Sequence, residues 1–165
     1  MRYFFPLILT LILIGCEKEE KTTLEPLHVD TPNKPLHVKI KEIEEELQNI
    51  DTTEYLEDYI VNITMNGSAN QLGFPAGDMQ GGFAYKSDAK NIARYVVTLL
   101  KKKSTNDKKA EKAEIFFTSN CGGCHGHDGS GLNGAFPNLT QYPLLGIMKR
   151  KEDLSIKLKR LKMTN

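Results

Sequence analysis

Apolar residues recur every three or four positions along three stretches of the chain, which is the spacing of one buried face of an α-helix. The first stretch covers residues 39–66, the second begins at residue 87 and runs to 103, and the third covers residues 109–119. The apolar positions are Ile40, Ile43, Leu47, Ile50, Tyr55, Leu56, Tyr59, Ile60, Ile63, Ile92, Tyr95, Val96, Leu99, Leu100, Ala113, Phe116 and Phe117. No segment alternates steadily between apolar and polar residues, so the pattern predicts an all-α fold.

The first stretch contains the signals of two helices. Asp51 stands three residues before Glu54, a spacing typical of a helix that begins with a capping side chain. Gly67 follows the last apolar positions and suits the left-handed turn that ends many helices. We therefore expect a second helix to begin at Asp51 as its N-cap and to end before Gly67.

The chain begins with the features of an export signal. Arg2 precedes an apolar run over residues 3–14, which is shorter than the roughly 20 residues that span a bilayer. The run ends in Gly15 and Cys16, which resembles the lipobox of bacterial lipoproteins, where the cysteine is lipidated after cleavage. We expect residues 1–15 to be a signal peptide and Cys16 to carry the lipid. An uncleaved anchor or an ordinary signal peptide are the alternatives, and each places the remaining chain outside the cytoplasm.

The segment after the export signal has the composition of a linker. Residues 16–40 are rich in charge, proline and threonine, and such a segment buries too little surface to offset the entropy of ordering. The total length of 165 residues then leaves one main domain over residues 41–165. The formal net charge is only +1, which argues against a protein that binds nucleic acid through bulk charge.

The pattern Cys121-Gly122-Gly123-Cys124-His125 matches the C-x-x-C-H sequence at which c-type haem is attached. Two thiols at this spacing can reach the two vinyl groups on one edge of a porphyrin, and the imidazole of His125 then lies beneath the iron. A thioredoxin-like redox pair would need a βαβ setting, and a zinc site would need two further ligands. A Cys121–Cys124 disulfide would leave His125 unexplained. The motif therefore favours one covalent haem c.

The residues around this motif resemble those of class I cytochromes c, which are small all-α electron carriers. Phe117 precedes the first cysteine by four positions, as an aromatic residue does in that family, and Ala113 stands where the family often has glycine. Residues 126–131 and 136–139 are similar to the glycine-rich loop and the Pro-Asn-Leu motif of the family. The resemblance implies a helical fold around the haem in which the carbonyl of Pro137 accepts the free N–H of the proximal imidazole.

The order of the two halves departs from that family. In class I cytochromes c, a loop with a distal methionine and a closing helix follow the haem motif. Here a similar loop, residues 74–79, and a similar helix at residues 92–97 lie upstream of it. We expect a permuted domain in which residues 41–103 form the distal-ligand half and residues 108–165 the haem-attachment half. A reduced tandem cytochrome with two incomplete domains is the alternative.

The resemblance also implies a methionine as the distal iron ligand. Met79 is the preferred candidate because an amphipathic helix follows its loop and can hold it in place. Met163 is the alternative, although it lies two residues from the end of the chain. Where the halves meet, the resemblance places Tyr95 near Ala113 and Phe117.

Together these features predict a lipid-anchored c-type cytochrome on the periplasmic side of a bacterial membrane. It would carry single electrons between the redox proteins of a respiratory chain. No acid–base pair or nucleophile is evident in the sequence, so we expect an electron carrier and not an enzyme. Two alternatives stay open: a protein whose open sixth site reacts with gases or peroxide, and an accessory haem subunit of a respiratory complex.

Charge is segregated along the chain. Residues 41–58 carry eight acidic side chains against Lys41, and residues 149–162 carry seven basic ones against Glu152 and Asp153. Three interpretations fit: solvated helix faces, a docking patch for a redox partner, and a pair of segments that contact each other. The last would suit a permuted fold that closes on itself.

Overall fold

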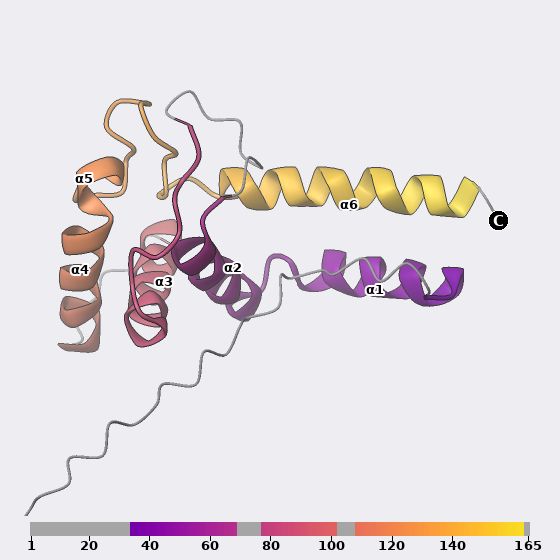
Figure 1. Cartoon of the computed structure of the whole chain (residues 1–165), viewed down its shortest axis with the longest axis horizontal. Helices are drawn as coiled ribbons and strands as arrows, with labels where there is room; N and C mark the ends of the chain where they lie inside the picture. Colours follow the sequence, from indigo (N-terminus) through magenta and orange to yellow (C-terminus); the bar gives the residue numbers. More distant parts are fainter. Residues whose placement is uncertain (1–33, 69–76, 102–107, 164–165) are drawn as a thin grey trace, which may run out of the picture.

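The computed structural model describes residues 34–68, 77–101 and 108–163, and within these ranges it contains six helices and no strand (Figure 1). The helices are α1 (Leu36–Asn49), α2 (Thr53–Asn66), α3 (Lys86–Leu100), α4 (Lys108–Asn120), α5 (Gly122–His125) and α6 (Leu145–Met163). The prediction of an all-α fold is confirmed. Residues 1–15 and Cys16 lie outside the described ranges. Among the helices described, none combines the length and the apolar character needed to cross a membrane.

The first helix begins earlier than the pattern predicts, at Leu36, so the last residues of the expected linker 16–40 are helical. Pro35 occupies the N-cap position, where its missing N–H costs no hydrogen bond. The carbonyl of Pro35 accepts the N–H groups of Val38 and Lys39 at 3.0 and 3.1 Å. The helix therefore starts directly after Pro35, within the segment whose composition predicts a linker.

The start of α2 differs by one residue from the expectation that Asp51 is its N-cap. Thr52 takes that place, and its Oγ1 accepts the N–H of Tyr55 at 3.2 Å. Asp51 instead accepts hydrogen bonds from Tyr142 at 2.6 Å and Lys151 at 2.5 Å, so tertiary partners use its carboxylate. The end of α2 agrees with the prediction, because Gly67 follows the helix with φ of 82°.

Helices α2, α3 and α4 pack in sequence against one another at one end of the molecule (Figure 1). Tyr95 of α3 contacts Phe117 of α4, with ring centroids 5.1 Å apart, and Ala113 is buried beside them. This is the contact that the cytochrome resemblance implies. It joins the upstream and downstream parts of the chain through one apolar core.

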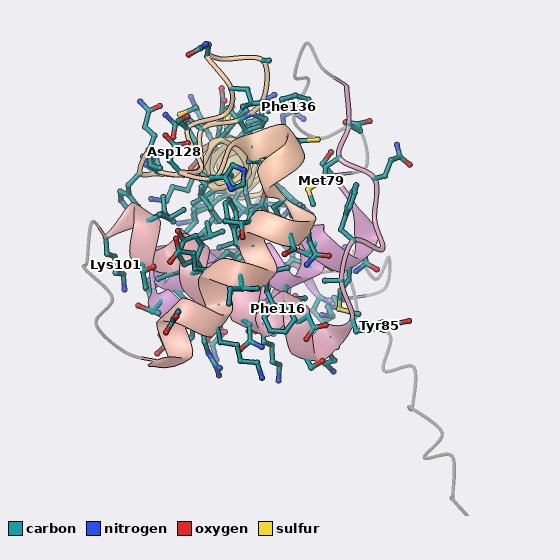
Figure 2. The ribbon with its side chains drawn as sticks, turned by 90° about the vertical axis from the view of Figure 1, so that its left-hand side faces the viewer. Met79, Tyr85, Lys101, Phe116, Asp128 and Phe136 are labelled. Carbon is teal, nitrogen blue, oxygen red and sulfur yellow. The ribbon has the colours of Figure 1, made fainter. Side chains whose placement is uncertain are left out.

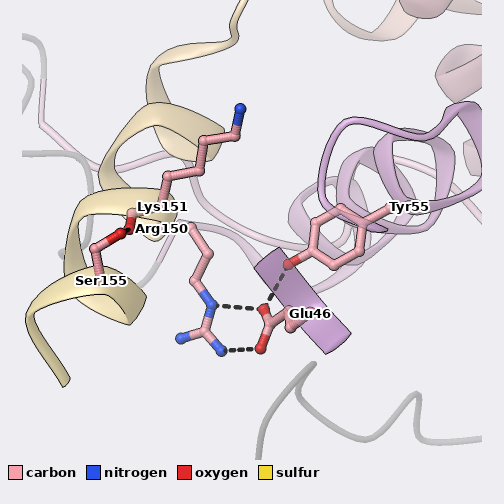
Figure 3. Close-up of polar contacts among 5 residues, drawn as sticks. All are labelled: Glu46, Tyr55, Arg150, Lys151 and Ser155. Carbon is pink, nitrogen blue, oxygen red and sulfur yellow. Dashed lines mark hydrogen bonds and ion pairs between the residues drawn. The ribbon is translucent and has the colours of Figure 1, made fainter. Parts of the chain in front are cut away.

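Helices α1 and α6 lie side by side and project from that cluster (Figure 1). The guanidinium of Arg150 donates two hydrogen bonds to Glu46, at 2.8 and 2.9 Å, and the hydroxyl of Tyr55 donates to the same carboxylate at 2.6 Å (Figure 3). Further ion pairs join the two charged segments, Lys151 with Asp51 and Lys162 with Glu44. Of the three interpretations of the segregated charge, pairing within the chain is confirmed.

Candidate haem-binding site

The cysteine motif forms a single helical turn at the end of α4. Cys121 donates its N–H to Phe117 at 2.7 Å, and its carbonyl accepts the N–H groups of Cys124 and His125 at 3.2 and 2.9 Å. Residues three and four apart share one face of a helix, so the turn gathers both thiols and the imidazole. Neither cysteine forms a disulfide: Cys121 is a buried free thiol and Cys124 an exposed one.

The imidazole of His125 is oriented by the backbone of the following loop. Its Nδ1 lies 3.0 Å from the carbonyl oxygen of Pro137, so a protonated Nδ1 donates there and leaves Nε2 to bind a metal. The loop returns to His125 through Gly131, which has φ of 82° and donates its N–H to the His125 carbonyl at 2.8 Å. A Cβ at this glycine would lie 2.1 Å from the carbonyl oxygen of Phe136, so a side chain cannot fit.

A cavity of about 300 Å³, which lies at the lower end of the range of small-molecule pockets, opens beside this turn. Most of its wall is apolar, with contributions from α2, α3, α4, the loop after α5 and the start of α6. The lining includes Ile60, Ile63, Met79, Ile92, Val96, Phe117, Cys121, Cys124, His125, Phe136, Pro137, Leu139 and Leu144. The structure thus brings the upstream candidate ligand and the downstream motif to one cavity. Figure 2 shows Met79 and Phe136 in this region.

The two candidate methionines lie in different surroundings. Met79 is half-buried and lines the cavity that His125 also lines. Met163 is 77% exposed in the last position of α6 and does not line the cavity. Of the two, only Met79 shares the cavity with the imidazole.

Burial shifts the pKa values of two side chains in the motif, Cys121 and His125. Burial, with a smaller contribution from the charge of Cys124, raises the pKa of the Cys121 thiol to about 11. Burial also lowers the pKa of His125, and the hydrogen bond to Pro137 opposes this change only in part. The imidazole is therefore neutral at pH 7, which is the form that binds a metal.

The donor set suits a c-type haem. Two thiols on one helical turn, a neutral imidazole with Nε2 available and a thioether surround an apolar cavity, which are the elements of covalent attachment and axial ligation. Within the described ranges, no three His, Cys, Asp or Glu side chains gather as they would around a metal ion bound by the protein alone.

One further residue beside this site, Ser68, is not indicated by any sequence pattern. Ser68, directly after Gly67, is 1% exposed, and its hydroxyl oxygen accepts the N–H of Met79 at 2.9 Å. A serine after a helix-ending glycine is common in loops, so the sequence held no signal that distinguishes this hydroxyl from a solvated one.

The comparisons with known proteins found similarity to one subunit of a respiratory oxidase. The chain is 38% identical over 79 residues to CcoP, a subunit of the cbb3-type cytochrome c oxidase of Helicobacter pylori strain ATCC 700392 / 26695, and 37% identical to CcoP of strain 52. The aligned part covers 46% of this chain and 27% of each relative, so the chain spans about a quarter of the length of these relatives. No protein family and no solved structure matches the chain.

Proposed function

We propose that the chain is a monohaem c-type cytochrome built as one permuted domain. Cys121 and Cys124 would hold the haem through thioether bonds, His125 would bind the iron on the proximal side, and Met79 on the distal side. One observation carries this proposal: Met79 and the C-x-x-C-H turn, which lie about forty residues apart in the chain, line the same apolar cavity. Two separate, incomplete domains would give no reason for a shared cavity.

Residues of this chain would orient the iron ligand, shield the haem and set its reduction potential. A bound haem supplies one-electron redox chemistry. Pro137 fixes the plane of the His125 ring through Nδ1, which tunes the basicity of the ligand. Apolar side chains of α2, α3 and the loop after α5 line the cavity and would limit the access of water to a bound haem. A thioether ligand from Met79 would raise the reduction potential relative to ligation by imidazole alone.

The proposed role is electron transfer among respiratory proteins, and not catalysis. The similarity to CcoP supports a place beside a cbb3-type oxidase, as donor or as relay. The sequence of residues 1–16 supports a periplasmic location with Cys16 as the lipid anchor. Replacing Cys16 with serine should release the protein from washed membranes, and retention of that variant would contradict the anchor.

A second candidate function is that of an accessory haem subunit held permanently in an oxidase. The similarity to an oxidase subunit favours it specifically. A permanent subunit would co-purify with the oxidase in detergent at high salt, whereas a mobile carrier would separate from it. The gas- or peroxide-reactive alternative requires an iron without its methionine, so the position of Met79 at the cavity counts against it.

The haem proposal is tested by covalent attachment. The full chain, produced with a periplasmic haem-maturation system, should retain haem on a denaturing gel and give the pyridine haemochrome of haem c. Replacing both Cys121 and Cys124 with alanine should abolish the haem stain, and His125→Ala should remove the axial imidazole. His127→Ala is the matched control because His127 is exposed in the same loop. Unchanged staining without the two thiols, or none in the natural chain, would contradict the proposal.

A further inference from the structure

The loop that carries Met79 is fixed to the end of α2 by backbone hydrogen bonds. Ser68 donates its N–H to the carbonyl of Met79 at 2.9 Å, and Gly82 donates its N–H to the carbonyl of Met65 at 2.9 Å. These two contacts place residues 79–82 alongside the last turn of the helix. The backbone of Met79 is thereby set by α2, whose side chains form part of the cavity wall.

Glycines make this close approach possible. A Cβ at Gly67 would lie 2.5 Å from the Met79 carbonyl oxygen, and a Cβ at Gly81 would lie 2.6 Å from the Met65 carbonyl oxygen. Gly67 also has φ of 82°, a conformation that side chains disfavour. The chain therefore runs against the helix end at a distance that only glycine permits.

The side chain of Ser68 completes the connection. Its Oγ accepts the N–H of Met79 at 2.9 Å and lies 3.3 Å from Oδ1 of Asp78, to which it donates. Ser68 thus bonds Met79 on both sides, through its own backbone to the carbonyl and through its hydroxyl to the N–H. Because the serine is 1% exposed, water does not readily replace the hydroxyl.

We infer that Ser68 is the positioning residue that holds Met79 against the iron site, an inference that rests on the proposed function. A thioether is a weak ligand, and its bond to iron depends on how firmly the protein presents it. Loss of the hydroxyl leaves the N–H of the half-buried Met79 without this partner, and the loop would then relax away from α2. The methionine would leave the iron more often, although every iron ligand is still present.

The test compares two hydroxyl deletions, one beyond each end of α2. Ser68→Ala removes the hydroxyl at the Met79 end of α2. Thr52→Ala removes the hydroxyl that accepts the Tyr55 N–H at the opposite end, away from the cavity lining. Both are made in the full haem-loaded chain. The readouts are the methionine-to-iron charge-transfer band of the oxidised protein and the affinity for added imidazole, which competes with the thioether.

Ser68→Ala should weaken the charge-transfer band and bind imidazole about tenfold more tightly, which corresponds to the loss of one hydrogen bond that holds the competing ligand. Thr52→Ala should leave both readouts at the wild-type value. Ser68→Thr retains the hydroxyl and should restore the wild-type imidazole affinity.

A Ser68→Ala variant with the band and imidazole affinity of Thr52→Ala overturns the role of Ser68 while leaving the haem proposal intact. A Ser68→Thr variant that binds imidazole as tightly as Ser68→Ala overturns it as well, because the hydroxyl then has no effect. If the natural chain binds haem but lacks the band, the ligation by Met79 and the role of Ser68 both fail. A chain without covalent haem instead refutes the proposed function itself.

Discussion

The carboxylate of Asp51, which lies between α1 and α2, forms hydrogen bonds with two other parts of the chain. Asp51 accepts hydrogen bonds from Lys151 of α6 and from Tyr142 of the loop before it. These bonds, the one from Lys151 first, lower the pKa of Asp51 below its ordinary value of 3.8. The bond with Tyr142 also raises the pKa of that phenol to about 12.

The shift in Asp51 predicts a contribution to acid stability. Because the folded-state pKa is depressed, the stabilisation is present above the ordinary value near 3.8 and is lost as the pH falls through the folded-state pKa. Asp51→Asn should therefore lower the free energy of unfolding at pH 7 by about 0.5–1 kcal/mol, a modest value because the pair is partly exposed. The difference from the natural chain should be smaller at pH 2 than at pH 7, because the stabilisation declines as the pH falls below the ordinary value of 3.8. Urea unfolding at both pH values measures it, with Asp58→Asn on the exposed side of α2 as control.

At the residue scale, a motif of neighbouring residues can be recognised in the sequence, whereas a contact between residues far apart in the chain cannot. Cys121, Cys124 and His125 lie within five consecutive residues, so their spacing can be recognised without a structure. Thr52 replaced Asp51 as the cap because Lys151 and Tyr142, about a hundred residues away, use the aspartate. Ser68 gained its role from a contact across residues 69–78, which no local pattern records.

At the scale of elements, one of the ion pairs between the segments of α1 and α6 is less exposed than the other two. Glu46 is only 10% exposed in its side chain and accepts both nitrogens of Arg150, in addition to the Tyr55 hydroxyl. Burial and this bond to Glu46 raise the pKa of Tyr55, so the phenol stays a donor at neutral pH. The contact joins α1, α2 and α6 (Figure 3).

Removing Arg150 should therefore lower the free energy of unfolding more than the loss of an ordinary surface ion pair does. Arg150→Met should lower the free energy of unfolding by about 1–3 kcal/mol, because the largely buried carboxylate of Glu46 loses two charge-assisted hydrogen bonds. Lys41→Met, which removes the exposed pair with Glu45, should cost no more than about 0.5 kcal/mol. Chemical denaturation of both variants gives the comparison. Equal losses would show that the Glu46–Arg150 contact contributes no more than a surface pair.

Helix α6 is an element that the pattern of apolar residues does not predict clearly. Its buried and half-buried positions, Ile147, Leu154, Leu158 and Leu161, follow helical spacing, but the seven basic residues between and around them dilute the apolar signal. The three stretches that predicted helices each carry a denser apolar face. The acidic partner of α6 lies about a hundred residues upstream, so only the folded chain shows why its charge is tolerated.

At the scale of the whole molecule, the proposed haem site requires that both halves of the chain form one domain whose connections are permuted. The first residues of α1 and the last residues of α6 lie at the same end of the helix pair (Figure 1). A short linker can therefore join residue 163 to residue 34, and the chain can be opened between α3 and α4 instead. This rearrangement would place the proposed distal-ligand half after the haem-attachment half, which is the order in class I cytochromes c.

A rearranged chain tests that requirement. Residues 1–33 would be followed by residues 108–163, a Gly/Ser linker and residues 34–101. It should bind covalent haem, unfold in one transition and lie within about 2 kcal/mol of the natural chain in unfolding free energy, because only the loop connections change. A natural-order chain with the same linker in place of residues 102–107 controls for the linker. Two separate unfolding transitions would show that the halves are independent modules.

The central claim is that an upstream methionine completes a haem site whose other ligands lie downstream. The most direct measurement is the methionine-to-iron charge-transfer band of the oxidised, haem-loaded chain, recorded for the natural protein, Met79→Ala and Met163→Ala. We expect the band in the natural protein and in Met163→Ala, because Met163 is exposed at the end of α6, and we expect its loss in Met79→Ala. A band that persists in Met79→Ala and disappears in Met163→Ala would show that Met79 is not the iron ligand.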